Sequence, residues 1–297
     1  MKRDRAAAAA AAGSTASSSA AAAAAGDSRA LSLHLVQVPL GAPALDPSGA
    51  SPRALLSAFT HGLGADPFLS SHYRHGHAVA VVGGGAARVA RITEDLFCAG
   101  SIRALAASTA SERIHAWLPG GGVEASGGRS TLDSLKLEDA GAAMTAYNAG
   151  GSLYMRSSPE AALALVPRFA EAVNGSTASY YAPGQAEPRG EVEVLASRKG
   201  HKTFWHSDFQ ENFTLQLRGS KAWRLVRAAT RSPVRGATPH FVTPSDLVEA
   251  QVKAHRSAGD ASFAFWPGSD YFSSAASVTL VPGDLLYFPA GGYGATG

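Results

Sequence analysis

His206 and Asp208 are the two residues whose types and spacing most directly suggest chemistry. They are two positions apart, so on an extended strand both side chains point to the same face. An imidazole and a carboxylate that converge in this way are two of the three ligands of the facial triad that binds non-haem Fe(II). The pair alone is a weak signal, because most such pairs are surface polar residues, so the neighbouring sequence has to decide.

The residues that follow the pair predict two strands joined by a turn. Phe213 and Leu217 lie on one face of the first strand, a turn follows at 218–220, and Lys221 and Trp223 begin the next strand. Lys221 is then placed to return toward the face of the His-x-Asp pair, where its ammonium could pair with the distal carboxylate of a small diacid. The alternative is a solvated lysine at a strand end.

The pattern of apolar residues changes along the chain from helical to alternating, and this predicts the fold. Helices are expected at the capped start Ser51-Pro52 and over 137–147 and 159–173. After Gly175, short strands are expected at 192–195, 213–217, 223–226, 278–281 and 285–288, and this pattern is typical of a jelly roll. The predicted class is α+β, with a helical N-terminal part packed on a C-terminal β-domain.

The composition separates a tail from the fold. Residues 1–30 hold 15 of the 60 Ala and +2 of the net charge of +3, which predicts a low-complexity disordered tail. The expected domains are this tail, a helical and mixed part at 31–175, and a β-barrel core at 176–297. The body is near neutral, so no direct nucleic-acid binding is expected. No apolar run is long enough to predict a membrane span. The single cysteine, Cys98, favours a reducing compartment.

Three motifs together resemble a known family. They are His-x-Asp at 206–208, Gln-Leu-x-Gly-x-Lys-x-Trp at 216–223 and Pro-Gly-Asp-Leu-Leu-Tyr-Phe-Pro at 282–289. Over roughly residues 52–297 the chain resembles the Jumonji-C/cupin-like 2-oxoglutarate oxygenases, which have a double-stranded β-helix fold. The nearest branch by this resemblance is the ribosomal oxygenases, which are histidyl hydroxylases also described as lysine demethylases.

The resemblance implies a role for each matching residue. His206 and Asp208 would be Fe(II) ligands, and Lys221 would bind the C5 carboxylate of the co-substrate 2-oxoglutarate, with O₂ as the second co-substrate. Tyr180 would add a hydrogen bond to the same carboxylate, and Thr203 would contact the co-substrate. For Tyr180 and Thr203 the alternative is an ordinary strand residue.

One position departs from the family pattern. The third iron ligand would be a His ten residues after Asp284, and Gly294 stands there; no His follows His255. The chain ends at Gly297, so the β-helix is expected to be truncated at its C-terminal end. One interpretation is a truncated or mis-spliced gene model, or a fragment, and the other is a true pseudoenzyme.

The resemblance implies oxygenation of a protein side chain. The expected reaction is hydroxylation of a ribosomal-protein histidine, demethylation of a histone lysine, or both, with a ribosomal protein or histone tail as partner. The alternative is a catalytically dead cupin-like scaffold or binding module, which Gly294 favours, and a small-molecule or lipid oxygenase remains a third reading. The resemblance to this family also allows a homodimer, formed through regions absent from this sequence. The expected location is nucleus or nucleolus, with cytoplasm, or an organelle through the Ala/Ser/Arg N-terminus, as the alternative.

Overall fold

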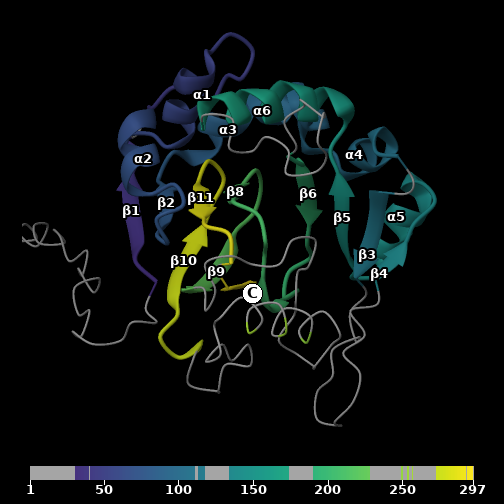
Figure 1. Ribbon diagram of the computed structural model, residues 1–297. Helices are drawn as coiled ribbons and strands as arrows, with labels where there is room; N and C mark the ends of the chain where they lie inside the picture. The colour runs from purple at the N-terminus through teal and green to yellow at the C-terminus, as the bar shows by residue number, and fades with distance from the viewer. Residues whose placement is uncertain are drawn as a thin grey trace, which may run out of the picture.

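The computed structural model describes most of the chain after the low-complexity tail. The described residues are 31–39, 41–110, 113–117, 134–173, 190–227, 272–291 and 293–296, together with the isolated positions 249, 253 and 256. Figure 1 shows helices over the top of the sheets and at both flanks. The mixed helix-and-sheet class expected from the sequence is confirmed.

The strands of the described residues form three four-stranded sheets, in the orders β1-β2-β11-β8, β10-β9-β12-β7 and β4-β3-β5-β6. The strands are β1 (Leu33–Gln37), β2 (Ala78–Val82), β3 (Ile114–Trp117), β4 (Ser134–Lys136), β5 (Ser152–Arg156), β6 (Glu193–Ala196), β7 (Thr203–Ser207), β8 (Asn212–Leu215), β9 (Lys221–Val226), β10 (Ala276–Leu280), β11 (Leu285–Phe288) and β12 (Tyr293–Thr296). The first sheet joins β1 and β2 from the N-terminal part to β8 and β11 from the C-terminal part.

Several of the helices begin directly after a capping side chain. They are α1 (Pro52–Phe59), α2 (Ala65–Ser71), α3 (Gly85–Leu96), the 3-10 turn η1 (Cys98–Gly100), α4 (Ile102–Ser108), α5 (Ala140–Asn148) and α6 (Pro159–Ala172). Ser51 and Ser158 accept hydrogen bonds from the backbone of α1 and α6, and a Pro follows each of them. The helix predicted from residue 137 begins later, because Asp139 caps α5 and β4 comes before it.

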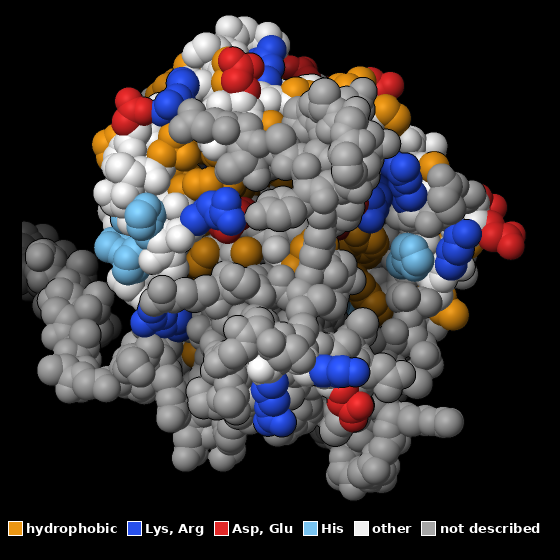
Figure 2. All heavy atoms as spheres, in the orientation of Figure 1, with side chains coloured by type: hydrophobic (Ala, Val, Ile, Leu, Met, Phe, Trp, Pro, Cys, Tyr) orange, Lys and Arg blue, Asp and Glu red, His pale blue; other side chains and the backbone are white. Residues whose placement is uncertain are grey.

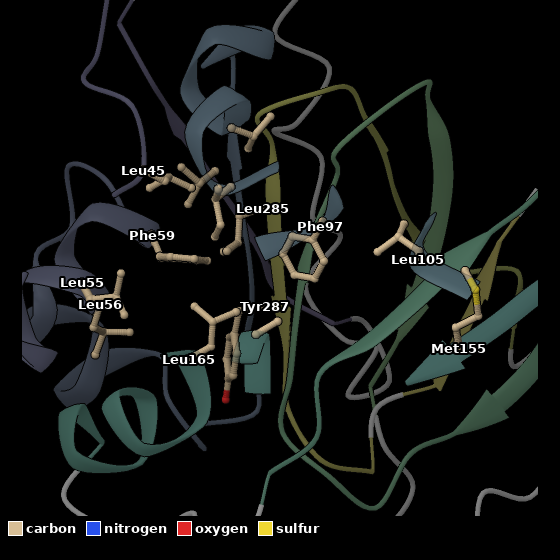
Figure 3. Close-up of a cluster of buried hydrophobic side chains, with 14 of the residues drawn as sticks. Leu45, Leu55, Leu56, Phe59, Phe97, Leu105, Met155, Leu165, Leu285 and Tyr287 are labelled. Carbon is tan, nitrogen blue, oxygen red and sulfur yellow. The ribbon is translucent and has the colours of Figure 1, made fainter. Parts of the chain in front are cut away.

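The central strands β2 and β11 are buried on both faces, and each face belongs to a different core. On one face, Val79, Val81, Leu285 and Tyr287 pack against the helices, as part of the cluster shown in Figure 3. On the other face, alternate residues of the two strands pack against Trp223, Leu225 and Leu280 of the second sheet; these are Ala78, Ala80, Leu286 and Phe288. The second sheet therefore turns one face toward the first, with an apolar layer between them.

The turn before β11 is fastened to the helical part by buried polar groups. Arg88 of α3 is 1% exposed and donates hydrogen bonds to the carbonyls of Gly283, Ala58 and Phe59. Asp284 is also 1% exposed, and its carboxylate accepts the N–H groups of Gly83 and Val281. The Pro-Gly-Asp motif is thus the point where α3 and both cores meet. No described helix has the length and apolar character needed to cross a membrane.

Candidate metal centre

The strand register places Gly294, where the resemblance expects a third ligand, directly beside His206. In the sheet β10-β9-β12-β7, Gly294 of β12 pairs with His206 on one side and with Leu225 of β9 on the other. Directly opposed residues of antiparallel strands project from the same face. Leu225 is 1% exposed and belongs to the layer between the sheets, so this row of residues lies on the inner face.

Lys221 lies on the same inner face. Lys221, Trp223 and Leu225 are every second residue of β9, so their side chains share one face, and both Trp223 and Leu225 pack in the layer between the sheets. The Lys221 Nζ is 5.5 Å from the centroid of the Trp223 ring, and burial lowers the pKa of this lysine. Its positive charge in turn contributes to lowering the pKa of His201, after the larger effect of burial. The sheet therefore turns a partly desolvated cation toward the face that carries His206.

His206 and Asp208 converge at the end of β7. Their Nε2 and Oδ2 atoms are 3.9 Å apart, and the two side chains are 16% and 24% exposed. The position of Asp208 is fixed by the turn after β11, because its carbonyl accepts the N–H of Gly291 at 2.6 Å. Trp205, which alternates with His206 along β7, stacks on Phe272 on the opposite face. The pair thus has the common orientation that its spacing predicts.

The donor set fits two of the three positions of a facial iron site. An imidazole nitrogen and a carboxylate oxygen are suitable ligands for Fe(II), and the pair is partly shielded from water. The third position that the resemblance implies is Gly294, which pairs with His206 and has no side chain to donate. Within the described ranges, no group of three His, Cys, Asp or Glu residues is arranged to hold a metal ion.

Of the two other residues predicted to contact the co-substrate, Thr203 lies within the described residues and Tyr180 does not. Thr203 is the first residue of β7 and is half-buried, three positions before His206 on the same strand. Tyr180 lies outside the described residues, so its role stays a prediction.

A partly buried polar network near the pair could not be predicted from the sequence. Glu211, three residues after Asp208, accepts a hydrogen bond from the Tyr287 hydroxyl at 2.6 Å, and its other oxygen lies 3.7 Å from Nε of Arg74. The same hydroxyl accepts the Arg74 N–H at 2.8 Å. Burial raises the pKa of Glu211 and also that of Tyr287. This network ties the loop that carries Asp208 to β11, but its members are more than 70 residues apart in the sequence and carry no local signal.

Comparison with known proteins gives one finding. A family model for the JmjC domain matches residues 186–294, a range that contains His206, Asp208, Lys221 and Gly294. No curated protein gives a significant match to the chain. Residues 186–294 therefore support a place for this chain in the JmjC/cupin-like oxygenase superfamily.

Proposed function

We propose that this chain is a 2-oxoglutarate- and Fe(II)-dependent oxygenase of the JmjC type that acts on a protein side chain. The observation that carries the proposal is the shared inner face of His206, Gly294 and Lys221, within a region that matches the JmjC domain. We also propose that the two facing sheets form a double-stranded β-helix around this face. The ribosomal oxygenases are the branch whose motifs the chain resembles.

In this proposal, His206 and Asp208 would hold Fe(II), which together with 2-oxoglutarate and O₂ supplies the oxidising chemistry when bound. Lys221 would pair with the far carboxylate of 2-oxoglutarate and so orient the diacid along the inner face. Because Lys221 is partly desolvated, its ion pair with a carboxylate would be stronger than one on the surface. Trp223 and the layer between the sheets would exclude water from the same face.

The proposed substrate is a histidine of a ribosomal protein or a methylated lysine of a histone tail, and the proposed location is the nucleus or nucleolus. Both follow from the resemblance to the ribosomal oxygenases. Candidate peptides of the two kinds, offered to the same preparation, would separate hydroxylation from demethylation, since the first adds the mass of one oxygen atom and the second removes the mass of one CH2 unit.

A second function is favoured by Gly294. Since the residue opposite His206 cannot donate a ligand, the inner face would serve as a cupin-like binding module that takes up a small diacid without turning it over. In that case Lys221 would still pair with a carboxylate of the diacid, and His206 and Asp208 would not be needed as metal ligands.

The test compares binding and turnover in the same preparation. We expect Fe(II)-dependent release of succinate from 2-oxoglutarate by the wild-type chain, and its loss in His206→Ala. Lys221→Met should weaken 2-oxoglutarate binding by at least about tenfold, since it removes a charge-assisted pair, while the exposed Lys202→Met should not. Binding that depends on Lys221 without any succinate release would contradict the oxygenase and support the binding module.

A further inference from the structure

A bulge in β7 decides which of its residues share the inner face with His206. His206 pairs with Gly294 of β12. Three residues earlier Thr203 pairs with Thr296, although these partners on β12 are only two residues apart. β7 therefore contains one extra residue between the two pairs, and this residue shifts the alternation of side chains by one position. Thr203 and His206 thus project from the same face, although their odd spacing would separate them on a regular strand.

The contacts of Trp205 agree with this bulge. Its ring stacks on Phe272, and the guanidinium carbon of Arg224 lies 5.3 Å from its centroid. Arg224 directly follows Trp223, which packs in the layer between the sheets, so Arg224 projects from the outer face. Trp205 therefore lies on the outer face, and the bulge allows Thr203, two residues before it, to lie on the inner face.

His201 extends the inner face by one further row of side chains. Thr203 and Trp223 lie in the same row, because Thr296 pairs with both of them. His201 is two residues before Thr203. Lys221 is likewise two residues before Trp223, so it lies in the same row as His201. The exposure of the side chains agrees, since His201 and Thr203 are half-buried and the residue between them is exposed.

The turn before β7 sets the position of His201. Its N–H donates to the carbonyl of Arg198 at 3.1 Å, and Gly200 between them has a φ of 85°. Glycine adopts this left-handed conformation without the steric cost that a side chain brings. The chain therefore reverses directly before His201 and enters the second sheet with this residue.

The side chains of His201 and Lys221 flank the same space. β7 and β9 are both neighbours of β12, so their backbones are two strand spacings, or about 9.5 Å, apart. Burial lowers the pKa of His201, and the nearby charge of Lys221 lowers it further. The imidazole is therefore neutral at pH 7 and does not repel the ammonium. A carboxylate between the two would accept a hydrogen bond from each.

A third donor on this face also lacks a partner. Trp223 is 9% exposed, and its Nε1 makes no hydrogen bond within the described part of the chain. Buried N–H groups are nearly always paired. An ammonium, an imidazole and an indole N–H on one face together suit a ligand that is rich in acceptor oxygens.

We propose that His201 is a second anchor for the far carboxylate of 2-oxoglutarate, which it binds together with Lys221. This assignment rests on the proposed function, because it takes the diacid as the ligand of the inner face. Lys221 supplies the charge, and His201 donates a hydrogen bond from the other side of the carboxylate. A site that donates to a polar group of its ligand rejects the analogue that lacks this group. His201 thus contributes to the choice of a dicarboxylate over a monocarboxylate.

The test compares the binding of 2-oxoglutarate with that of 2-oxopentanoate, which has the same chain length and no far carboxylate. Each acid is titrated by calorimetry into the full chain with Fe(II) and without O₂. The variants are His201→Ala, His201→Arg and, as a matched control, His115→Ala. Figure 2 shows histidine side chains at two flanks of the molecule, where Figure 1 places β1 and β3. His115 belongs to β3, in a different sheet from His201 and Lys221.

We expect His201→Ala to lower the affinity for 2-oxoglutarate by at least about tenfold, since it removes a hydrogen bond to a charged group. The affinity for 2-oxopentanoate should not change, and His201→Arg should restore most of the lost affinity because it again places a donor there. Unchanged 2-oxoglutarate affinity in His201→Ala, or an equal loss for both acids, would overturn the role of His201 and leave the diacid site itself intact. No binding of 2-oxoglutarate by the wild-type chain would instead contradict the proposed function.

Discussion

The turn at Asp284 that fastens β11 to α3 and the candidate metal centre at His206 lie in facing sheets. Their charged groups differ in the partners that they have. At this turn, Arg88 and Asp284 are buried, and their side chains form hydrogen bonds with backbone groups. At the candidate centre, Lys221 is partly desolvated and turned to the inner face, and His206 and Asp208 face one another. From this difference we expect the buried groups at the first sheet to contribute to stability, and we propose that those of the second sheet serve a ligand.

The largest effect is expected at Arg88. Replacing it by Met leaves three buried carbonyls without a donor, and we expect a loss of about 3 kcal/mol or more in the free energy of unfolding. Arg91→Met, in the same helix, is the control, because its ion pairs are half-exposed and surface pairs contribute about 0–1 kcal/mol. Denaturant unfolding measures both. Equal losses of unfolding free energy in the two variants would contradict a stabilising role for the buried hydrogen bonds of Arg88.

A smaller loss is expected at Asp284. Asp284→Ala removes the charged acceptor of the N–H groups of Gly83 and Val281, which should lower the free energy of unfolding by about 2 kcal/mol. Asp66→Ala is the control, since its side chain is 86% exposed. Hydrogen exchange of the β11 amides should rise in the first variant alone, and unchanged exchange would show that the turn is held by other contacts.

The network around Glu211 should appear as a dependence of stability on pH. Because burial raises the pKa of Glu211, the folded protein retains the proton at a higher pH than the unfolded chain does. The stability from this proton is fully present below the ordinary value of 4.5 and is lost as the pH rises through the raised value. Glu211→Gln should therefore flatten the curve of unfolding free energy against pH over this window. An unchanged curve would mean that other groups produce the dependence.

The smallest effect on stability is expected at Lys221. Since burial disfavours its charge, Lys221→Met should leave the free energy of unfolding unchanged or raise it slightly, even though it should weaken 2-oxoglutarate binding. The exposed Lys202→Met should change neither quantity. If Lys221→Met destabilised the fold as Arg88→Met does, Lys221 would belong to the scaffold.

The sequence predicted those features whose causes are local. The helix after Ser51 and Pro52 and the strand over 285–288 were found because capping residues and apolar runs act over a few neighbours. The His-x-Asp pair was found for the same reason. The pairing of β2 with β11 could not be predicted, because the two strands are about 200 residues apart in the sequence. Nothing in the residues of one strand specifies the other as its partner. The contact of His34 with His72 could not be predicted either, because it arises only through the pairing of β1 with β2.

The central claim is that the inner face of the second sheet is an iron centre whose third position is Gly294, and this position can be tested directly. The measurement is Fe(II) affinity, together with succinate release, in the wild type and in Gly294→His, with Gly294→Phe as a variant of similar bulk that has no donor. Because Gly294 is directly opposite His206, the new imidazole should complete the ligand set and raise Fe(II) affinity by at least about tenfold. A rise in affinity and turnover in Gly294→His alone is the predicted result. No rise in either quantity, or the same rise in Gly294→Phe, would contradict the claim.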